Sequence, residues 1–258
     1  MLNPSSKLIP TLLLVAILLL AFALRVYRLD VTPPGLHYDE AFKALSADEI
    51  IRTGQLKVFF PGNFGEEPLH ATTLALLFEL AGERVWTVRL TSALYGFLFV
   101  VGIYFAASIF LNGKRPALVA TFIAATMYWS LNFARIGIET ITLATLITFH
   151  FGALLKLLTS SGTSSLGVKW ILLSGFFAGA VYYTYLASRV TPVALALFGI
   201  YLLLFHREQV RTNLKPIALA SLVAFVTLTP LGWFFINNPS AFFARAGQVL
   251  TPEQFGSN

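Results

Sequence analysis

No cysteine occurs among the 258 residues. Its absence excludes a fold stapled by disulfides, thiolate catalysis and a zinc site built on cysteine. Charge is scarce too, because 12% of the residues are charged whereas a soluble domain carries about 25%. So few charges cannot cover the surface of a soluble domain of this length, and 57% of the residues are hydrophobic. The composition therefore predicts an all-α polytopic membrane protein.

The charges that are present are mainly basic and give a formal net charge of +6. On a soluble protein this surplus would suggest a nucleic-acid partner. No basic cluster is interleaved with aromatic residues, however, and basic loops on a membrane protein usually report its orientation. We therefore expect the lipid bilayer, and no nucleic acid, among the partners.

Seven runs without a charged residue predict about seven transmembrane helices. A helix needs about 20 mostly apolar residues to cross a bilayer. The two shortest runs have 16 residues, and flanking side chains such as Lys156 and Arg189 can extend them. The first run continues into Arg25 and Tyr27, which look like interface anchors and favour an uncleaved anchor over a signal peptide. The runs are residues 8–24, 90–111, 116–134, 140–155, 170–188, 190–205 and 216–244.

Residues 68–78 form an eighth, shorter apolar run that contains His70. A run of this length is more often interfacial than spanning, and a span here would turn every later basic loop outward. With seven spans and a cytoplasmic N-terminus, the inner loops hold eight basic residues and one acid, Glu208. We therefore expect this segment to lie at the outer membrane surface. The eight basic residues are Lys7, Lys114, Arg115, Lys156, Lys169, Arg207, Arg211 and Lys215.

One large outer loop, residues 28–88, lies between the first two spans and holds nine of the twelve acidic residues. The turn Pro33-Pro34-Gly35 breaks the first helix. A second helix is predicted from Asp39 to Arg52, and Gly54 would end it. This helix has a partly apolar face suited to lying on lipid, so we expect amphipathic juxtamembrane helices in the loop.

Asp39 and Glu40 at the start of this helix have two interpretations. Asp39 could cap the helix N-terminus, and both acids would complement the helix dipole. Alternatively, a carboxylate held just above the lipid surface could act as a general base or metal ligand. Adjacent residues of a helix point in different directions, so at most one of the two is expected to be the base.

Glu66, Glu67 and His70 form a second polar cluster. Together with His37 they are candidates for binding an acceptor or a divalent cation, although their spacing matches no compact metal motif. The alternative is a solvated turn before a helix, with Pro68 at the first helical position. The metal is therefore unknown, and a divalent cation is the sole cofactor hypothesis.

Four further charges, Arg89, Arg135, Glu139 and Arg189, fall at the outer helix ends in this topology. Each has a simple alternative, which is a side chain that extends to the membrane interface. Taken together, the arginines suit a phosphate ligand, and the carboxylates suit a hydroxyl that must lose a proton. The combination indicates a transferase that uses a lipid-phosphate donor.

The chain resembles the family-39 glycosyltransferases with the C-type membrane fold, which include protein O-mannosyltransferases and aminoarabinose transferases. The resemblance is carried by short motifs that follow one another in the same order along almost the whole chain. They are His37-Tyr38-Asp39-Glu40-Ala41, Gly65-Glu66-Glu67-Pro68-Leu69, Val88-Arg89-Leu90 with Ser92-Ala93-Leu94, Ala134-Arg135-Ile136-Gly137, Tyr183-Thr184-Tyr185-Leu186-Ala187-Ser188-Arg189 and Pro239-Ser240-Ala241-Phe242-Phe243-Ala244-Arg245.

The resemblance implies a membrane hexosyl- or pentosyltransferase whose sugar donor is a polyprenyl phosphate taken from the outer leaflet. It implies Asp39 as the catalytic base with Glu40 beside it, and Arg89, Arg135 and Arg189 near the donor phosphate. The aminoarabinose branch has Lys-Pro-Pro where this chain has Glu66-Glu67-Pro68, and this departure argues against the acceptor chemistry of that branch.

Members of the family are roughly twice as long as this chain. Residues 1–258 are therefore expected to be the N-terminal part of a transmembrane glycosyltransferase domain, and residues 28–88 its outer catalytic loop. The acceptor could be a protein, a lipid or a glycan.

Two alternatives remain open. A transporter or flippase for an anionic lipid or sugar would also place arginines near the membrane, but it should carry charges near the bilayer midplane and show repeated or broken helices. A non-catalytic, truncated fragment of the fold would keep the helices without turnover.

Overall fold

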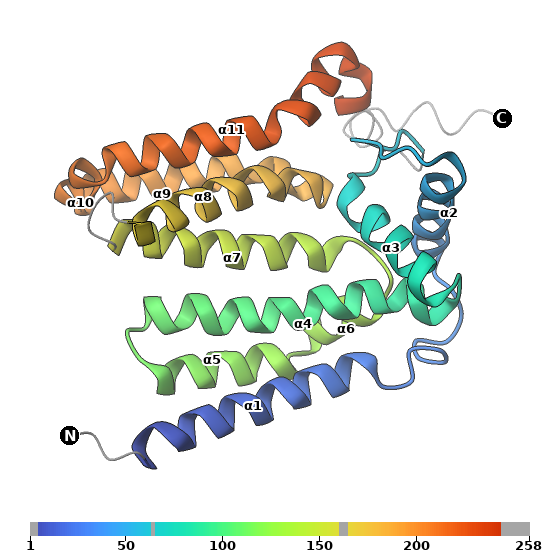
Figure 1. Ribbon diagram of the computed structural model, residues 1–258, viewed down its shortest axis with the longest axis horizontal. Coiled ribbons are helices and arrows are strands. Elements are labelled where there is room, and N and C mark those ends of the chain that lie inside the picture. The colour runs from blue at the N-terminus through green and yellow to red at the C-terminus, as the bar shows by residue number, and fades with distance from the viewer. Residues whose placement is uncertain (1–4, 63–64, 160–164, 244–258) are drawn as a thin grey trace, which may run out of the picture.

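The structure is a computed structural model that describes residues 5–62, 65–159 and 165–243. In this part of the chain every regular element is helical, and the only extended pairing is an isolated bridge between Phe60 and Glu66. Long helices run side by side, and the loops gather at the two ends of the bundle (Figure 1). The all-α fold predicted from composition is confirmed.

The bundle contains seven apolar helical segments. Five described segments are long and apolar enough to cross a membrane, and the pair α5–α6 gives a sixth when its 51° bend is allowed. The remaining helix, α8, has 16 residues and continues into a short 3-10 turn, η1 (Val181–Tyr183). The count of seven spans stays a prediction. The seven are α1 (Ser5–Val26), α4 (Val85–Phe110), α5 (Lys114–Thr126) with α6 (Tyr128–Arg135), α7 (Thr140–Thr159), α8 (Ser165–Ala180), α9 (Thr191–Phe205) preceded by η2 (Leu186–Val190), and α11 (Leu214–Asn237).

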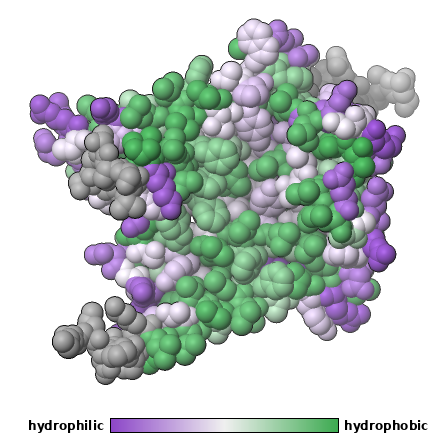
Figure 2. Space-filling model, in the orientation of Figure 1, coloured by the Kyte–Doolittle hydropathy of each residue, from purple (hydrophilic) through white to green (hydrophobic). Residues whose placement is uncertain are grey.

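The sides of the bundle are apolar and its ends are polar, as Figure 2 shows for one face. Large side chains such as Leu12, Val193 and Phe225 are 57%, 59% and 69% exposed on α1, α9 and α11. Apolar surface of this extent is compatible with lipid and not with water. The chain is an integral, multi-pass membrane protein.

The bend between α5 and α6 lies at Met127, whose extended backbone (φ −61°, ψ 130°) interrupts the helix. The interruption leaves the last carbonyl groups of α5 without helical partners. Arg25 of α1 donates to the carbonyl oxygens of Ala125 at 3.1 Å and Ala124 at 3.3 Å, and to Ser130 Oγ at 2.6 Å. The expectation that Arg25 is an interface anchor is therefore wrong: the side chain is fully buried and joins α1 to the break.

Two shorter helices, α2 (Tyr38–Thr53) and α3 (Pro68–Ala81), cover one end of the bundle (Figure 1). They pack together through a buried apolar cluster that includes Ile50, Leu74 and Phe78. The 14 residues of α3 rise only about 21 Å, which is less than the roughly 30 Å of a bilayer core. Their position supports the expected juxtamembrane helices, and we call this end of the bundle the α2–α3 end.

The start of α2 shows that the interpretation of Asp39 as the N-cap is wrong. The N-cap residue is His37, whose Nδ1 accepts from the backbone N–H of Asp39 at 3.2 Å, and Glu40 completes a capping box. Asp39 is therefore in the first turn and is not the cap. The predicted end is confirmed, since Gly54 adopts the left-handed conformation (φ 66°) and donates to the Ile50 carbonyl oxygen.

A short helix, α10 (Arg207–Thr212), lies at the opposite end of the bundle, between α9 and α11. Helices α8 and α11 approach each other closely at Gly175 and Gly179, which have no side chain. A Cβ atom on Gly179 would lie 2.6 Å from Cβ of Thr227. Small residues of this kind let membrane helices pack backbone to backbone.

Candidate active site

Arg89 organises the segment that leads into α2. Its guanidinium lies near the start of α4 and is 1% exposed. It donates from Nη1 to the carbonyl oxygens of Leu29 at 3.0 Å and Pro33 at 2.8 Å, and from Nη2 to that of Gly35. Nε donates to Oε1 of Glu40 at 3.0 Å. One arginine thus fixes the turn before α2 and its first helical turn.

Glu40 completes this network from the other side. Its Oε2 accepts from the backbone N–H of His37 at 2.7 Å, and its Oε1 accepts from that of Gly137 at 2.9 Å. Burial alone would raise the pKa of Glu40, but the hydrogen bonds from Arg89, His37 and Gly137 and the charge of Arg89 leave the pKa below its usual value. Glu40 is therefore an ionised carboxylate that joins α2 to α4 and to the segment between α6 and α7.

Asp39 differs from its neighbour in its surroundings. Its side chain is 38% exposed at the α2–α3 end, whereas that of Glu40 is 2% exposed. The prediction that adjacent carboxylates point in different directions is confirmed. Asp39 is therefore the more exposed carboxylate of the two.

Lys43 is a buried residue that sequence reasoning missed. Its Nζ lies 2.9 Å from Glu66 and 3.0 Å from Glu139, and the residue is 0% exposed. The three residues come from α2, from the turn before α3 and from the start of α7. The spacing of Lys43 could have predicted its burial, because Lys43 follows Glu40 by three positions and therefore lies on the same face of α2.

Glu67 and Arg189 form a second ion pair, 3.3 Å apart, between the start of α3 and η2. The side chain of Arg189 is 21% exposed and that of Glu67 is 3% exposed. Burial raises the pKa of Glu67, the charge of Arg189 opposes this rise, and the net direction is upward. The sequence hypothesis of a solvated turn is therefore wrong here, because the turn that precedes Pro68 is buried.

Arg135 anchors the end of α1. It donates to the carbonyl oxygens of Leu24 and Tyr27, each at 2.8 Å, and of Thr32 at 3.1 Å. Contact between this guanidinium and a donor phosphate stays a prediction, as it does for Arg89. Nη1 and Nη2 of both arginines already donate to carbonyl oxygens, which a phosphate at those atoms would have to replace.

His37 and His70 lie in different settings. His70 is fully buried and its Nε2 lies 3.0 Å from Ser92 Oγ. Burial and the nearby charge of Lys43 lower the pKa of His70 to about 3, so this imidazole is neutral at physiological pH. No three His, Asp or Glu side chains gather as metal ligands within the described ranges. His37, Glu66, Glu67 and His70 each have other contacts there.

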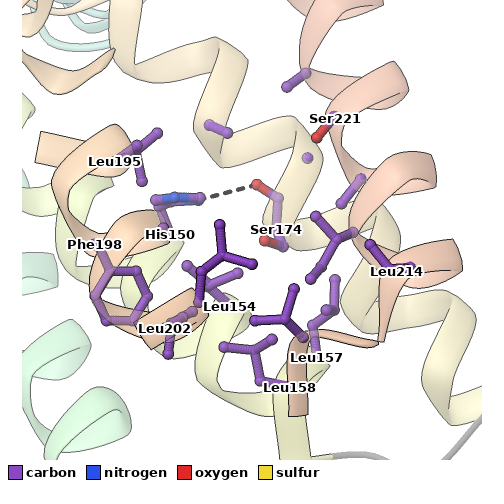
Figure 3. A pocket seen from close by; sticks show the side chains of 18 residues that line it. His150, Leu154, Leu157, Leu158, Ser174, Leu195, Phe198, Leu202, Leu214 and Ser221 are labelled. Atoms are coloured by element: carbon purple, nitrogen blue, oxygen red, sulfur yellow. Dashed lines mark hydrogen bonds between the residues drawn. The ribbon is translucent and has the colours of Figure 1, made fainter. Parts of the chain in front are cut away.

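A separate cavity of about 550 Å³ lies among α7, α8, α9 and α11 (Figure 3). Its walls are mainly leucine side chains such as Leu154 and Leu202, and His150 is its one titratable residue. Nδ1 of His150 forms a hydrogen bond with the carbonyl oxygen of Ser174 at 3.1 Å. With no carboxylate and no arginine in its lining, this cavity is not a candidate for the transfer chemistry. The carboxylates and arginines described above lie at the α2–α3 end.

The structure describes only part of the last motif that carries the family resemblance, residues 239–245. Phe242 contacts Arg189 through its ring and its carbonyl oxygen. Ala244 and Arg245 lie outside the described residues.

Solved structures with the same fold are two crystal structures of ArnT from Cupriavidus metallidurans. The apo form is matched with a TM-score of 0.72 and 19% identity over 93% of this chain and 44% of that chain. The form bound to undecaprenyl phosphate is matched with a TM-score of 0.71 and 21% identity over 96% and 45%. The chain thus spans under half the length of the ArnT chains that it matches.

The sequence comparisons address the family. No curated protein matches the chain. Residues 66–234, which cover most of the spans and the Glu67–Arg189 pair, match the family described as dolichyl-phosphate-mannose-protein mannosyltransferase. The chain belongs to the dolichyl-phosphate-mannose-protein mannosyltransferase family.

Proposed function

We propose that the chain transfers a sugar from a polyprenyl-phosphate donor to an acceptor hydroxyl at the α2–α3 end. The observation that carries the proposal is that two ion pairs connect the helix of Asp39, through the turn before α3, to Arg189. Asp39 and Lys43 both lie on α2, and Lys43 forms an ion pair with Glu66. The next residue in the chain, Glu67, forms an ion pair with Arg189. An exposed carboxylate and a partly exposed arginine are thereby held on one rigid framework.

The chemistry requires both groups. Asp39 would accept the proton of the acceptor hydroxyl as its oxygen forms a bond to the anomeric carbon. The bond from that carbon to the donor phosphate oxygen breaks, and the electron pair leaves with the phosphate. Arg189 would stabilise the phosphate through charge-assisted hydrogen bonds. Arg89 and Arg135 would hold the segment that carries Asp39, with direct phosphate contact as their predicted further role.

The donor class follows from the family and from the related structure that holds undecaprenyl phosphate. The apolar sides of the bundle suit a polyprenyl chain in the bilayer. The loop charges favour a cytoplasmic N-terminus and an outer α2–α3 end. In this arrangement residues 28–88 are the outer catalytic loop, and residues 1–258 form the N-terminal part of the glycosyltransferase domain.

Binding of undecaprenyl phosphate to the purified chain tests the donor site. Arg189→Ala should weaken binding about tenfold or more, because a charge-assisted hydrogen bond is worth about 1.5–3 kcal/mol. Arg207→Ala, on α10 at the opposite end, is the matched control and should bind as the wild type does. Equal loss in both variants would indicate unspecific charge attraction and contradict the proposal.

Sugar transfer separates the remaining alternatives. A flippase would move the lipid phosphate across vesicles without consuming the sugar donor, and a non-catalytic fragment would bind donor without turnover. Release of polyprenyl phosphate that depends on an acceptor is the result we expect.

A further inference from the structure

A pocket of about 350 Å³ lies beside the Glu67–Arg189 pair, between the start of α3, η2 and α11. Its walls are mostly apolar and include Leu231 and Phe235, while Glu67, Ser188 and Arg189 supply charged and polar atoms. Ser188 is 1% exposed, and its Oγ is buried without a hydrogen-bond partner. A buried hydroxyl in this state is costly unless a ligand or water accepts or donates a hydrogen bond. The pocket therefore combines an apolar wall with one unused hydroxyl and one cation.

The guanidinium of Arg189 is fixed within this pocket. Nη1 donates to the carbonyl oxygen of Phe242, and the guanidinium carbon lies 4.5 Å from the ring centroid of Phe242 and 5.3 Å from that of Phe235. Nη2 donates to Oε1 of Glu67 at 3.3 Å. A guanidinium has five N–H donors, so these contacts orient the group and leave donors for a ligand.

We propose that Glu67 is an internal counter-ion that the phosphate of the lipid donor displaces from Arg189. The proposal rests on the function proposed above and adds a selection step to it. Carboxylate and phosphate oxygens use the same donors of a guanidinium, and their charges repel each other at that distance. Only an anionic head group can take the place of Glu67, so a neutral polyprenol gains no affinity from Arg189.

The charges around Glu67 make this exchange sensitive to protons. Arg189 faces it from η2, Lys43 from α2, and Glu139 from the start of α7, while Glu66 precedes it in the chain. Burial and the charge of Glu139 raise the pKa of Glu67, and the charges of Arg189 and Lys43 lower it. When a phosphate displaces Glu67 from Arg189, Glu67 loses the nearby positive charge that lowers its pKa, and the pKa of Glu67 rises further. Phosphate binding and proton uptake by Glu67 are thus coupled.

The test compares the wild type with Glu67→Gln, which keeps the shape of the side chain and removes its charge. Undecaprenyl phosphate should bind the variant about fivefold more tightly at about pH 7.5, the effect of a partly exposed ion pair. The ratio of the two affinities should fall toward one at about pH 5, because Glu67 of the wild type is then protonated more often. Glu49→Gln, which removes an exposed carboxylate paired with Lys57, is the control and should leave the affinity unchanged.

Two further ligands distinguish the source of the phosphate. Undecaprenol, which has no charge, should bind both proteins equally. Inorganic phosphate should bind both more weakly than the lipid does, and equal affinity for the two phosphates would overturn the assignment to a lipid donor. Weaker or unchanged binding of undecaprenyl phosphate by Glu67→Gln would overturn the counter-ion role while leaving the proposed function intact. Absence of any binding by the wild type would overturn both.

Calorimetry on the wild type keeps the proposal testable if Glu67→Gln does not fold. Binding heats measured at about pH 7 in two buffers of different ionisation enthalpy give the number of protons exchanged. Net uptake of protons supports the displacement of Glu67. Binding without proton uptake overturns it.

Discussion

The Nε atom of Arg89 lies 3.0 Å from Oε1 of Glu40, although the two residues are 49 positions apart in the chain. Arg89 also donates hydrogen bonds to three carbonyl oxygens in the segment before α2. Glu40 also accepts a hydrogen bond from the backbone N–H of Gly137. The pair therefore joins α4, the start of α2 and the α6–α7 connection. It thereby fixes the backbone next to Asp39.

Removal of one partner should be strongly destabilising. Glu40→Ala leaves the guanidinium of Arg89 buried and unpaired, which we expect to cost about 3–5 kcal/mol. Asp48→Ala breaks the exposed pair with Arg52 and should cost at most about 1 kcal/mol. Thermal unfolding in detergent measures both changes. A Glu40→Ala protein as stable as Asp48→Ala would show that the network carries no structural role.

Lys43 should be coupled energetically to Glu139. Lys43→Met removes the cation between two buried carboxylates, and the repulsion between Glu66 and Glu139 should then destabilise the chain by about 3–5 kcal/mol. Glu139→Gln added to Lys43→Met should restore part of this loss. The double-mutant cycle gives the coupling, which should lie at about 0.5–3 kcal/mol. Strict additivity would contradict direct pairing.

Acid should weaken the fold through Glu40. Its pKa is lowered from 4.5 in the folded state, so the stability that it contributes is present above about pH 4.5 and is lost as the pH falls through the folded value. Glu67 has the opposite sign, because its raised pKa favours folding at low pH and opposes it as the pH rises through the folded value. Melting temperatures of Glu40→Gln should therefore depend less on pH below 4.5 than those of the wild type. A melting temperature of Glu40→Gln that falls as steeply with acid as that of the wild type would show that Glu40 is not the group responsible.

The sequence predicted the helices and the gathering of charges at one end, because both follow from local rules. Apolar runs require spanning helices, and charges at helix ends are costly to bury elsewhere. The sequence did not predict which side chains are paired. Lys43 was not among the predicted site residues, and Arg25 was expected to be an interface anchor, yet both are fully buried. Lys43 pairs with carboxylates of Glu66 and Glu139, and Arg25 donates to the carbonyl group of Ala125. These partners are far away in the chain, so the local sequence does not identify them.

The orientation of the bundle can be tested by labelling, because the chain has no native cysteine. A cysteine at Lys114, the first residue of α5, should be protected from an impermeant thiol reagent in intact cells. A cysteine at Leu56, which follows α2 and is 74% exposed, should react. The positive-inside rule gives this result. Labelling at Lys114 together with protection at Leu56 would reverse the proposed topology.

The central claim is that Asp39 is the general base. Asp39→Asn keeps the size of the side chain and removes its proton-accepting charge, and since His37 is the cap, stability should change by less than about 1 kcal/mol. Sugar transfer from a polyprenyl-phosphate donor should fall by about 10²–10⁴-fold, the usual contribution of general-base catalysis. The deciding measurement is the turnover rate of purified Asp39→Asn with saturating donor, compared with the wild type at equal folded fraction. A loss of at least 100-fold, in line with that contribution, is the predicted result, and an Asn variant that turns over at the wild-type rate would contradict the account.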